Sequence, residues 1–430
     1  MTALDRRSVH WRYLLLIGLR WLPVGFMIPI FVLVPLSRGL SLTEIGLVMS
    51  VQGLVVLALE LPTGGLSDSL GRRPVLILAS ILAIVSLVIF SLATTVTVFV
   101  IAMFLQGTYR ALDSGPLEAW YVDATLAADG DAPIERGLGH GSSVLSAAIA
   151  IGALASGGLV ALHPIAALDP LALPLVAAVV LHVVHLVGVT LLMTEAPKGR
   201  DHRAMAASIR AVPGVIADGI RLLRGSRVLT GLIAVEAFWG FSMVTFESLF
   251  PIRLADLVGG TDRAAAILGP VGSAAWFAAA VGSALVVALS GRLGVARSAA
   301  ILRIVQGATI VLMGWLAGPI GVVAAYLACY VAHGASNPMH TTLLHRQVDG
   351  PHRTTVLSMN SMIAQPAGSL GAIVLAALAD GSSVAIAMVV GGIICAVAAP
   401  LYIPAWRQER RRRAEGGATD ADQAPERIAA

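Results

Sequence analysis

The feature that most constrains this chain is a series of twelve long apolar segments that fills most of its 430 residues. Each is about as long as a helix needs to cross a bilayer, which takes roughly 20 residues. Only 13% of the residues are charged, against about 25% in soluble domains. The sequence therefore predicts an all-α integral membrane protein, with spans at residues 13–36, 44–64, 74–95, 97–125, 137–162, 172–193, 229–250, 263–290, 299–317, 319–345, 355–378 and 383–404.

A single long polar insert divides the chain into two similar halves. Its basic residues stand beside apolar residues at helical spacing, which predicts an amphipathic helix at the membrane surface. Two spans into each half the chain reaches a short basic loop, so that Leu70-Gly71 aligns with Leu293-Gly294. The expected domains are an N-terminal six-helix bundle (1–193), the cytoplasmic linker (194–228), a C-terminal six-helix bundle (229–406) and a basic, disordered tail (407–430).

Lysine and arginine are distributed by membrane side. One side receives both termini, the insert and most of the arginines, whereas the other receives only Arg38, Arg253 and Arg263. By the positive-inside rule, both termini are cytoplasmic in a multi-pass protein of the cell membrane. The same distribution leaves no basic patch for nucleic acid. Cys329 and Cys395 lie inside apolar runs, which supports neither a disulfide framework nor a metal site.

A short charged motif separates the second and third spans. Its residues Gly64, Leu66, Ser67, Asp68, Gly71, Arg72 and Arg73 match the signature of the major facilitator superfamily, which the whole chain resembles; Ser69 replaces a basic residue of that signature. The resemblance implies twelve helices in two six-helix bundles. It also implies that Asp68 caps a helix of the other half and that Arg72 meets Asp123, which closes the cytoplasmic side. In the simpler alternative the motif is a positive-inside turn that only sets topology.

The fourth span carries charges at a depth where they must pair or face water. Arg110 and Asp113 stand three residues apart, so they can pair on one helix face. Glu118 follows, next to Trp120, and is a candidate proton carrier with Asp113 as its rival. Alternatively, these charges form a self-neutralising structural group. Residues 114–123 also resemble a pattern of efflux-type members, which implies a drug/proton antiporter.

Other intramembrane residues are candidates for a central cavity. Arg20 and Glu236 lie in the first and seventh spans, and Trp239 offers aromatic surface beside Glu236. Alternatively, Glu236 only anchors its helix near the interface. Trp120 flanks the acidic pair, and Gln365 precedes a proline that bends the eleventh span. Glu247 is expected to pair with Arg253 at the rim. The intramembrane histidines, among them His185, His333 and His340, are expected to pack or hydrogen-bond, and no metal site is indicated. Alternatively, His333 or His340 titrates in a proton path.

These patterns predict a secondary transporter that works by alternating access as a monomer in the lipid bilayer. Its expected action is proton-coupled efflux of a small lipophilic drug-like compound or metabolite, without a cofactor. A proton-coupled importer is the alternative within transport, and a non-transporting scaffold or sensor is the alternative from another class. An enzyme is disfavoured because no nucleophile elbow, phosphate-binding loop or zinc motif is visible.

Overall fold

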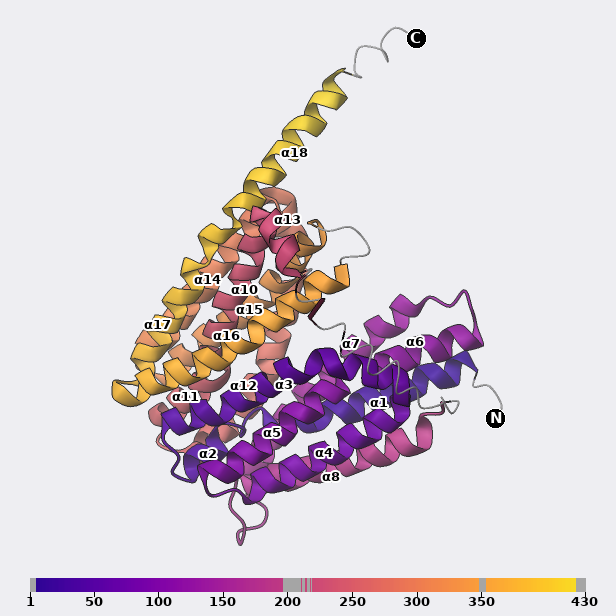
Figure 1. The fold of residues 1–430 in the computed structure, drawn as a ribbon. Helices are drawn as coiled ribbons and strands as arrows, with labels where there is room; N and C mark the ends of the chain where they lie inside the picture. The colour runs from indigo at the N-terminus through magenta and orange to yellow at the C-terminus, as the bar shows by residue number, and fades with distance from the viewer. Residues whose placement is uncertain are drawn as a thin grey trace.

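The computed structural model describes residues 5–195, 210, 213–214, 217, 219–347 and 353–422, and within them the secondary structure is helical. The N-terminal bundle contains eight helical segments (Figure 1). They are α1 (Arg6–Met27), α2 (Leu33–Ser37), α3 (Leu42–Leu70), α4 (Arg72–Leu92), α5 (Val96–Asp113), α6 (Pro116–Ala128), α7 (Ile134–Leu162) and α8 (Ala172–Leu192).

The C-terminal bundle repeats this plan with additional breaks. Its segments are α10 (Arg227–Val244), the π-helical turn η1 (Thr245–Leu249), α11 (Phe250–Val258), α12 (Thr261–Ala284), α13 (Val286–Leu293), α14 (Val295–Trp315), α15 (Pro319–His345), α16 (Arg353–Gly381), α17 (Val384–Val397), the 3₁₀ turn η3 (Ala399–Tyr402) and α18 (Ile403–Asp422).

Ten helical units among the described residues are long and apolar enough to cross a membrane. The first and fourth spans are the two others: α1 carries several arginines, and the α5–α6 pair is interrupted at Ser114 and Gly115. The predicted all-α architecture of twelve membrane helices in two bundles is therefore confirmed.

The two bundles touch at one end and diverge at the other (Figure 1). Both chain termini lie at the diverging end, which we call the termini end; the other is the remote end. Close packing between the bundles uses glycine, because a side chain on Gly46 would strike the Ala372 carbonyl and one on Gly157 would strike Gly269. Helices α3 and α16 form one of these contacts, and α7 and α12 form the other.

Two boundaries differ from the sequence-based expectation. The motif between the second and third spans is not a loop: α3 continues to Leu70, and only Gly71, with φ +91°, separates it from α4. The basic tail, expected to be disordered, is helical as far as Asp422. Arginine, alanine and glutamate are strong helix formers, so they prolong a helix that the membrane already stabilises. Most of the predicted amphipathic linker helix lies outside the described residues.

Glycine turns confirm the internal repeat at the level of the backbone. Gly71 and Gly294 have φ values of +91° and +85°, and each begins the third helix of its half. In both places a carboxylate accepts hydrogen bonds from the first two amides of that helix. The Glu195 carboxylate accepts from the backbone amides of Arg72 and Arg73 at 3.0 and 2.9 Å. The Glu409 carboxylate accepts from the backbone amides of Val295 and Ala296, both at 3.1 Å.

Candidate functional site

A break in the fourth span builds the candidate site. Gly115 has φ +94°, which a glycine adopts at little cost, and Pro116 then starts α6. Asp113 is therefore the last residue of α5, and Glu118 lies in the first turn of α6. Broken helices at membrane depth are tolerated where the backbone is buried in protein or lines a cavity. The break directs both carboxylates towards α1.

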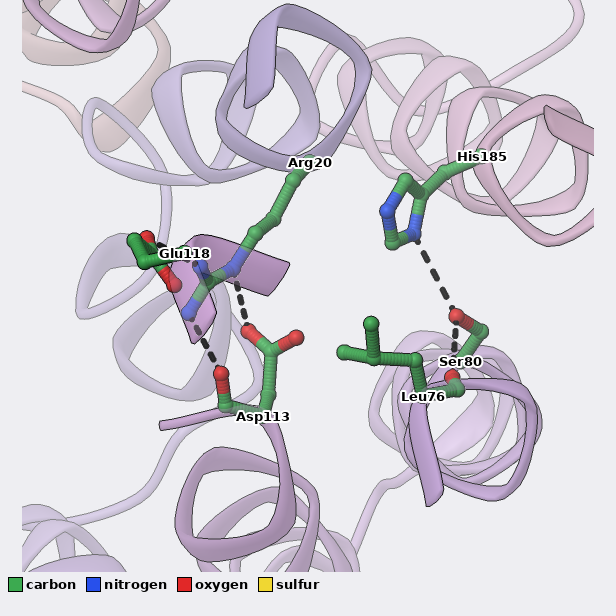
Figure 2. Close-up of polar contacts among 6 residues, drawn as sticks. All are labelled: Arg20, Leu76, Ser80, Asp113, Glu118 and His185. Carbon is green, nitrogen blue, oxygen red and sulfur yellow. Dashed lines mark hydrogen bonds and ion pairs between the residues drawn. The ribbon is translucent and has the colours of Figure 1, made fainter. Parts of the chain in front are cut away.

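Arg20 of α1 joins the two carboxylates (Figure 2). Its Nε donates to Oδ2 of Asp113 at 2.5 Å, and its Nη2 donates to the Asp113 carbonyl at 2.8 Å. Its Nη1 donates to Oε1 of Glu118 at 3.1 Å. Arg20 and Asp113 are only 7% and 5% exposed, whereas the Glu118 side chain is 37% exposed. One cation is therefore shared by two acids, and one of these acids reaches accessible surface.

The second oxygen of each carboxylate is buried and has no donor at ordinary hydrogen-bond distance and angle among the described residues, although the Tyr109 side chain interacts with the Asp113 carboxyl group. These atoms are Oδ1 of Asp113 and Oε2 of Glu118. A buried polar atom without a partner is costly, so native structures retain few of them. A proton on either carboxyl group would turn an unpaired acceptor into a hydroxyl and would remove one of two competing negative charges. The arrangement is suited to binding a proton.

Arg110 does not pair with Asp113, contrary to the sequence-based expectation. Asp113 turns to Arg20, which approaches from another helix, while Arg110 is exposed. The Arg110 guanidinium acts electrostatically, without a direct contact, both on Asp113 and on Glu247 in the π-helical turn of the opposite bundle. Glu247 was expected to pair with Arg253 at the rim, but the Arg253 guanidinium donates to the Leu316 carbonyl at 3.2 Å. The π-helical turn re-aims the side chains of the seventh span, which a regular helical pattern does not predict.

A second charged group is buried in the C-terminal bundle around Glu236, which is 6% exposed. Its Oε2 lies 3.5 Å from Nε2 of His340, and His340 also contacts Asn360 at 3.2 Å and the Tyr402 hydroxyl at 3.0 Å. Arg303, which is 2% exposed, acts on Glu236 electrostatically. Its Nη1 donates to Gln306 at 2.8 Å. Arg303 is not among the candidates that the sequence predicts, although an arginine inside the ninth span is a signal that could have identified it.

The remaining cavity candidates lie in different places. Trp239 is half-buried and stacks on His333, with ring centroids 5.6 Å apart. Trp120 is 3% exposed and donates to the Thr194 carbonyl at 3.0 Å, so its ring is enclosed within the N-terminal bundle. Gln365 lies where α16 passes Gly53 of α3. Of these three residues, Trp239 forms part of an aromatic group within the C-terminal bundle, and Gln365 lies at the interface between the bundles.

The motif residues cluster at the termini end of the N-terminal bundle. Arg72 donates to the Asp123 carboxylate and to the Ala119 carbonyl, which joins the pair that the sequence analysis expected. Arg73 donates to the Thr190 carbonyl at 2.7 Å. Gly64 and Asp68 belong to α3, but the side chain of Asp68 lies outside the described part of the chain. The gating role of the motif stays a prediction.

Histidine packing in the N-terminal bundle has a specific partner. Nδ1 of His185 lies 3.3 Å from the Ser80 hydroxyl, which donates to the Leu76 carbonyl at 2.8 Å (Figure 2). The His185 side chain is 2% exposed and near enough to Arg20 to be affected by its charge. His185 thus joins α8 to α4 next to the Arg20 group.

Comparisons with known proteins agree with this architecture. A family model described as Major Facilitator Superfamily matches residues 13–333. The nucleoside transporter NupG superposes with a TM-score of 0.74 at 13% identity, covering 92% of this chain and 98% of that one. A bacterial homologue of the human lysosomal transporter Spinster gives 0.71 at 14% identity, covering 94% and 97%. A mutant of a peptide transporter, POT, in complex with sulfate gives 0.71 at 13% identity, covering 94% of each chain.

A search among curated proteins returns no match. The structural likenesses, all below 25% identity, establish the fold, and the family model covers well over half of the chain. The protein is a multi-pass membrane transporter rather than an enzyme, and it belongs to the Major Facilitator Superfamily.

Proposed function

We propose that this protein is a proton-coupled secondary transporter that exports a small lipophilic compound by alternating access, with its proton site at Asp113 and Glu118. The observation that carries the proposal is the pair of buried, unpartnered carboxylate oxygens beside Arg20 at the helix break. A structural ion pair needs one acid for one arginine, and here a second acid shares the same guanidinium. The additional acid is the group that binds the proton.

Protonation changes the contacts that hold α1 against the α5–α6 break. With both acids charged, Arg20 binds Asp113 and Glu118 together. A proton on either acid removes one ion pair, and the energy of the present conformation rises relative to its alternative. Coupling follows because the proton and the substrate bind with different affinities to the two conformations. Glu118 is the entry point because its side chain is the more exposed.

We expect the substrate to bind between the bundles, where a charged group of one half acts on a charged group of the other. Arg110 from the N-terminal bundle is exposed and acts on Glu247 of the C-terminal bundle. The Trp239–His333 stack lies on the same C-terminal bundle, and His333 also adjoins Phe246 in the π-helical turn. Aromatic surface favours a lipophilic substrate, and the charges favour one with a polar group.

Orientation and assembly complete the proposal. We infer from the distribution of basic residues that the termini end is cytoplasmic. We expect the transporter to work as a monomer in the surface membrane of the cell. The bundles diverge at this end (Figure 1), so the present conformation faces inward. Labelling of an introduced cysteine at Ala127, near that end, by a reagent that cannot cross membranes tests the orientation. Protection in intact cells and reaction after permeabilisation are expected.

Import is the second candidate, because proteins with this fold include a nucleoside transporter and a peptide transporter. Everted membrane vesicles distinguish the two directions. A proton gradient that is acidic inside these vesicles is expected to drive accumulation of a dye or drug by the unaltered protein. Asp113→Asn and Glu118→Gln are expected to abolish this accumulation, whereas Glu135→Gln, at an exposed carboxylate, retains it.

Three results would each count against one part of the proposal: the direction of transport, the proton site or transport itself. Uptake into right-side-out vesicles under a gradient that is acidic outside would establish import. Gradient-driven flux that survives both substitutions would remove the proton site. No flux with any compound from a broad panel, together with tolerance of neutral substitutions throughout the fourth span, would favour the scaffold or sensor. A ligand-dependent rise in melting temperature selects the compounds to test.

A further inference from the structure

Helices α3 and α16 form an antiparallel pair across the two bundles. Both have 29 residues, and their contacts keep one register along much of their length. Thr43 contacts Asp380, Gly46 adjoins Ala376, Gly53 adjoins Ser369, and Glu60 accepts a hydrogen bond from Ser361 at 3.3 Å. As the residue number rises along α3, the number of the contacting residue in α16 falls by nearly the same amount. The C-terminal end of each helix therefore lies beside the N-terminal end of the other.

At the remote end this register places a carboxylate of one bundle on a helix terminus of the other. Asp380, near the end of α16, accepts hydrogen bonds from the Leu42 and Thr43 amides at 3.1 and 2.8 Å. It also accepts one from the Thr43 hydroxyl at 2.6 Å. The first amides of a helix have no partner within that helix, and its dipole favours a negative charge there. Three hydrogen bonds thus join the bundles at a single exposed carboxylate.

Helix α3 does not need Asp380 in order to be capped. Its own capping box is complete, because the Ser41 amide donates to Glu44 at 2.8 Å and the Glu44 amide donates to the Ser41 hydroxyl at 3.2 Å. The Leu42 and Thr43 amides, which donate to Asp380, are amides of the first turn that the capping box does not use. They lie at the surface, where water can replace the carboxylate. The contact can therefore break and form again without unfolding either helix.

We propose that Asp380 is a releasable latch that closes the remote end of the transporter by capping the N-terminus of α3. Separation of the bundles at this end must break the three hydrogen bonds of Asp380. The latch therefore stabilises the conformation in which only the termini end is open. It rests on the proposed alternating access, but it requires neither a known substrate nor proton coupling.

Continued beyond the Glu60–Ser361 contact, the same register would bring position 68, near the end of α3, level with position 354 at the start of α16. The α3–α16 pair thus offers an acidic residue and a helix N-terminus at each of its two ends. When the bundles rock about this pair, closing one end separates the groups at the other. The observed contact at Asp380 belongs to the remote end, so that end is where the proposal is tested.

Distances between spin labels report the latch without any substrate. One pair of labels, at Thr95 and Ala317, spans the remote end, and a second pair, at Ala127 and Val287, spans the termini end; all four positions are exposed. Asp380→Ala is expected to raise the ratio of remote-open to remote-closed molecules about tenfold or more, since hydrogen bonds to a charged group are lost. The termini-end pair should shorten in the same molecules.

Two matched variants separate a latch from a cap. Thr43→Val removes only the hydroxyl contact and is expected to give a smaller shift in the same direction. Glu44→Ala breaks the capping box of α3 without removing a partner of Asp380, and it is expected to lower the melting temperature without changing the distances. Asp262→Asn, at another exposed acid of the remote end, is expected to change neither.

A lower melting temperature for Asp380→Ala with unchanged distances in both pairs would overturn the proposal, because Asp380 would then only stabilise α3. If Asp380→Ala does not fold, Asp380→Asn and Thr43→Val decide the matter by the same distances. A shift in distances without gradient-driven flux would retain the latch and remove the proposed function. Gradient-driven flux without a shift in the distances would retain the proposed function and overturn the latch.

Discussion

The two bundles each bury a charged group, and the groups differ in a way that separates two roles. Arg20 and Glu236 both stand 15 residues before a proline, Pro35 or Pro251, so the first helix of each half carries a charge of opposite sign at the same place. In the N-terminal bundle one arginine faces two acids, and one acid is partly exposed. In the C-terminal bundle one acid meets an arginine and a histidine and is enclosed.

This difference indicates which group can exchange a proton. The N-terminal group lies at a broken helix, has an additional acid and retains two unpartnered carboxylate oxygens. The C-terminal group has neutral hydrogen-bonding partners, Asn360 and Tyr402, around its histidine. We therefore expect proton coupling to depend on the N-terminal group, and we expect the C-terminal group to position α10, α15 and α16.

The largest expected effect comes from removing the arginine of the N-terminal group. Arg20→Met leaves Asp113 buried without its cation, and breaking a buried pair in this way costs about 3–5 kcal/mol. Arg303→Met is expected to cost less, about 1–3 kcal/mol. Its direct hydrogen bond goes to the neutral Gln306, and Glu236, on which Arg303 acts only electrostatically, keeps its contact with His340. Thermal unfolding of both variants in the same detergent measures the difference. Equal losses would remove the proposed asymmetry.

The next effect is on coupling rather than on stability. Asp113→Asn is expected to reduce gradient-driven flux by about 5- to 150-fold, the usual size of a coupling free energy. Glu236→Gln is expected to retain the dependence on the proton gradient, even if its stability falls. Flux measured with and without an imposed gradient checks both variants. Loss of coupling in Glu236→Gln alone would transfer the proton site to the C-terminal bundle.

The helix break is expected to have a smaller cost. Gly115→Ala meets no atom within 4 Å, so its penalty is the positive φ alone, about 1–2 kcal/mol. Gly291→Ala also meets no atom, but it lies in a helix and is expected to stabilise the protein by about 0.4–1 kcal/mol. Unfolding midpoints of the two variants should move in opposite directions. A shared direction would mean that Gly115 has a role other than its backbone conformation.

The smallest expected effects on stability concern a feature that the two halves share, the carboxylate cap at the start of the third helix. Glu195→Gln and Glu409→Gln each weaken a carboxylate cap at the start of the third helix of a half, and each is expected to cost about 0.5–2 kcal/mol. Because the geometry is repeated, the two losses in thermal stability should be similar. A loss confined to one half would show that the repeated backbone no longer performs a repeated task.

The sequence was sufficient for the fold because bilayer length and the distribution of arginines constrain helices strongly. It also identified Arg20, Asp113 and Glu118 individually, since charges inside spans are costly. It did not identify their pairing, because spacing along one helix favoured Arg110, whereas the partner of Asp113 comes from α1. The Glu236–His340 contact likewise joins two helices, and the π-helical turn that contains Glu247 leaves no regular pattern.

Infrared difference spectroscopy of the carboxyl groups tests the central claim most directly. In the purified transporter, titration with acid is expected to produce a carboxylic C=O band that Asp113→Asn or Glu118→Gln removes and that Glu236→Gln leaves in place. A band that survives both N-terminal substitutions and disappears in Glu236→Gln would contradict the account, because the proton would then bind in the enclosed group of the C-terminal bundle.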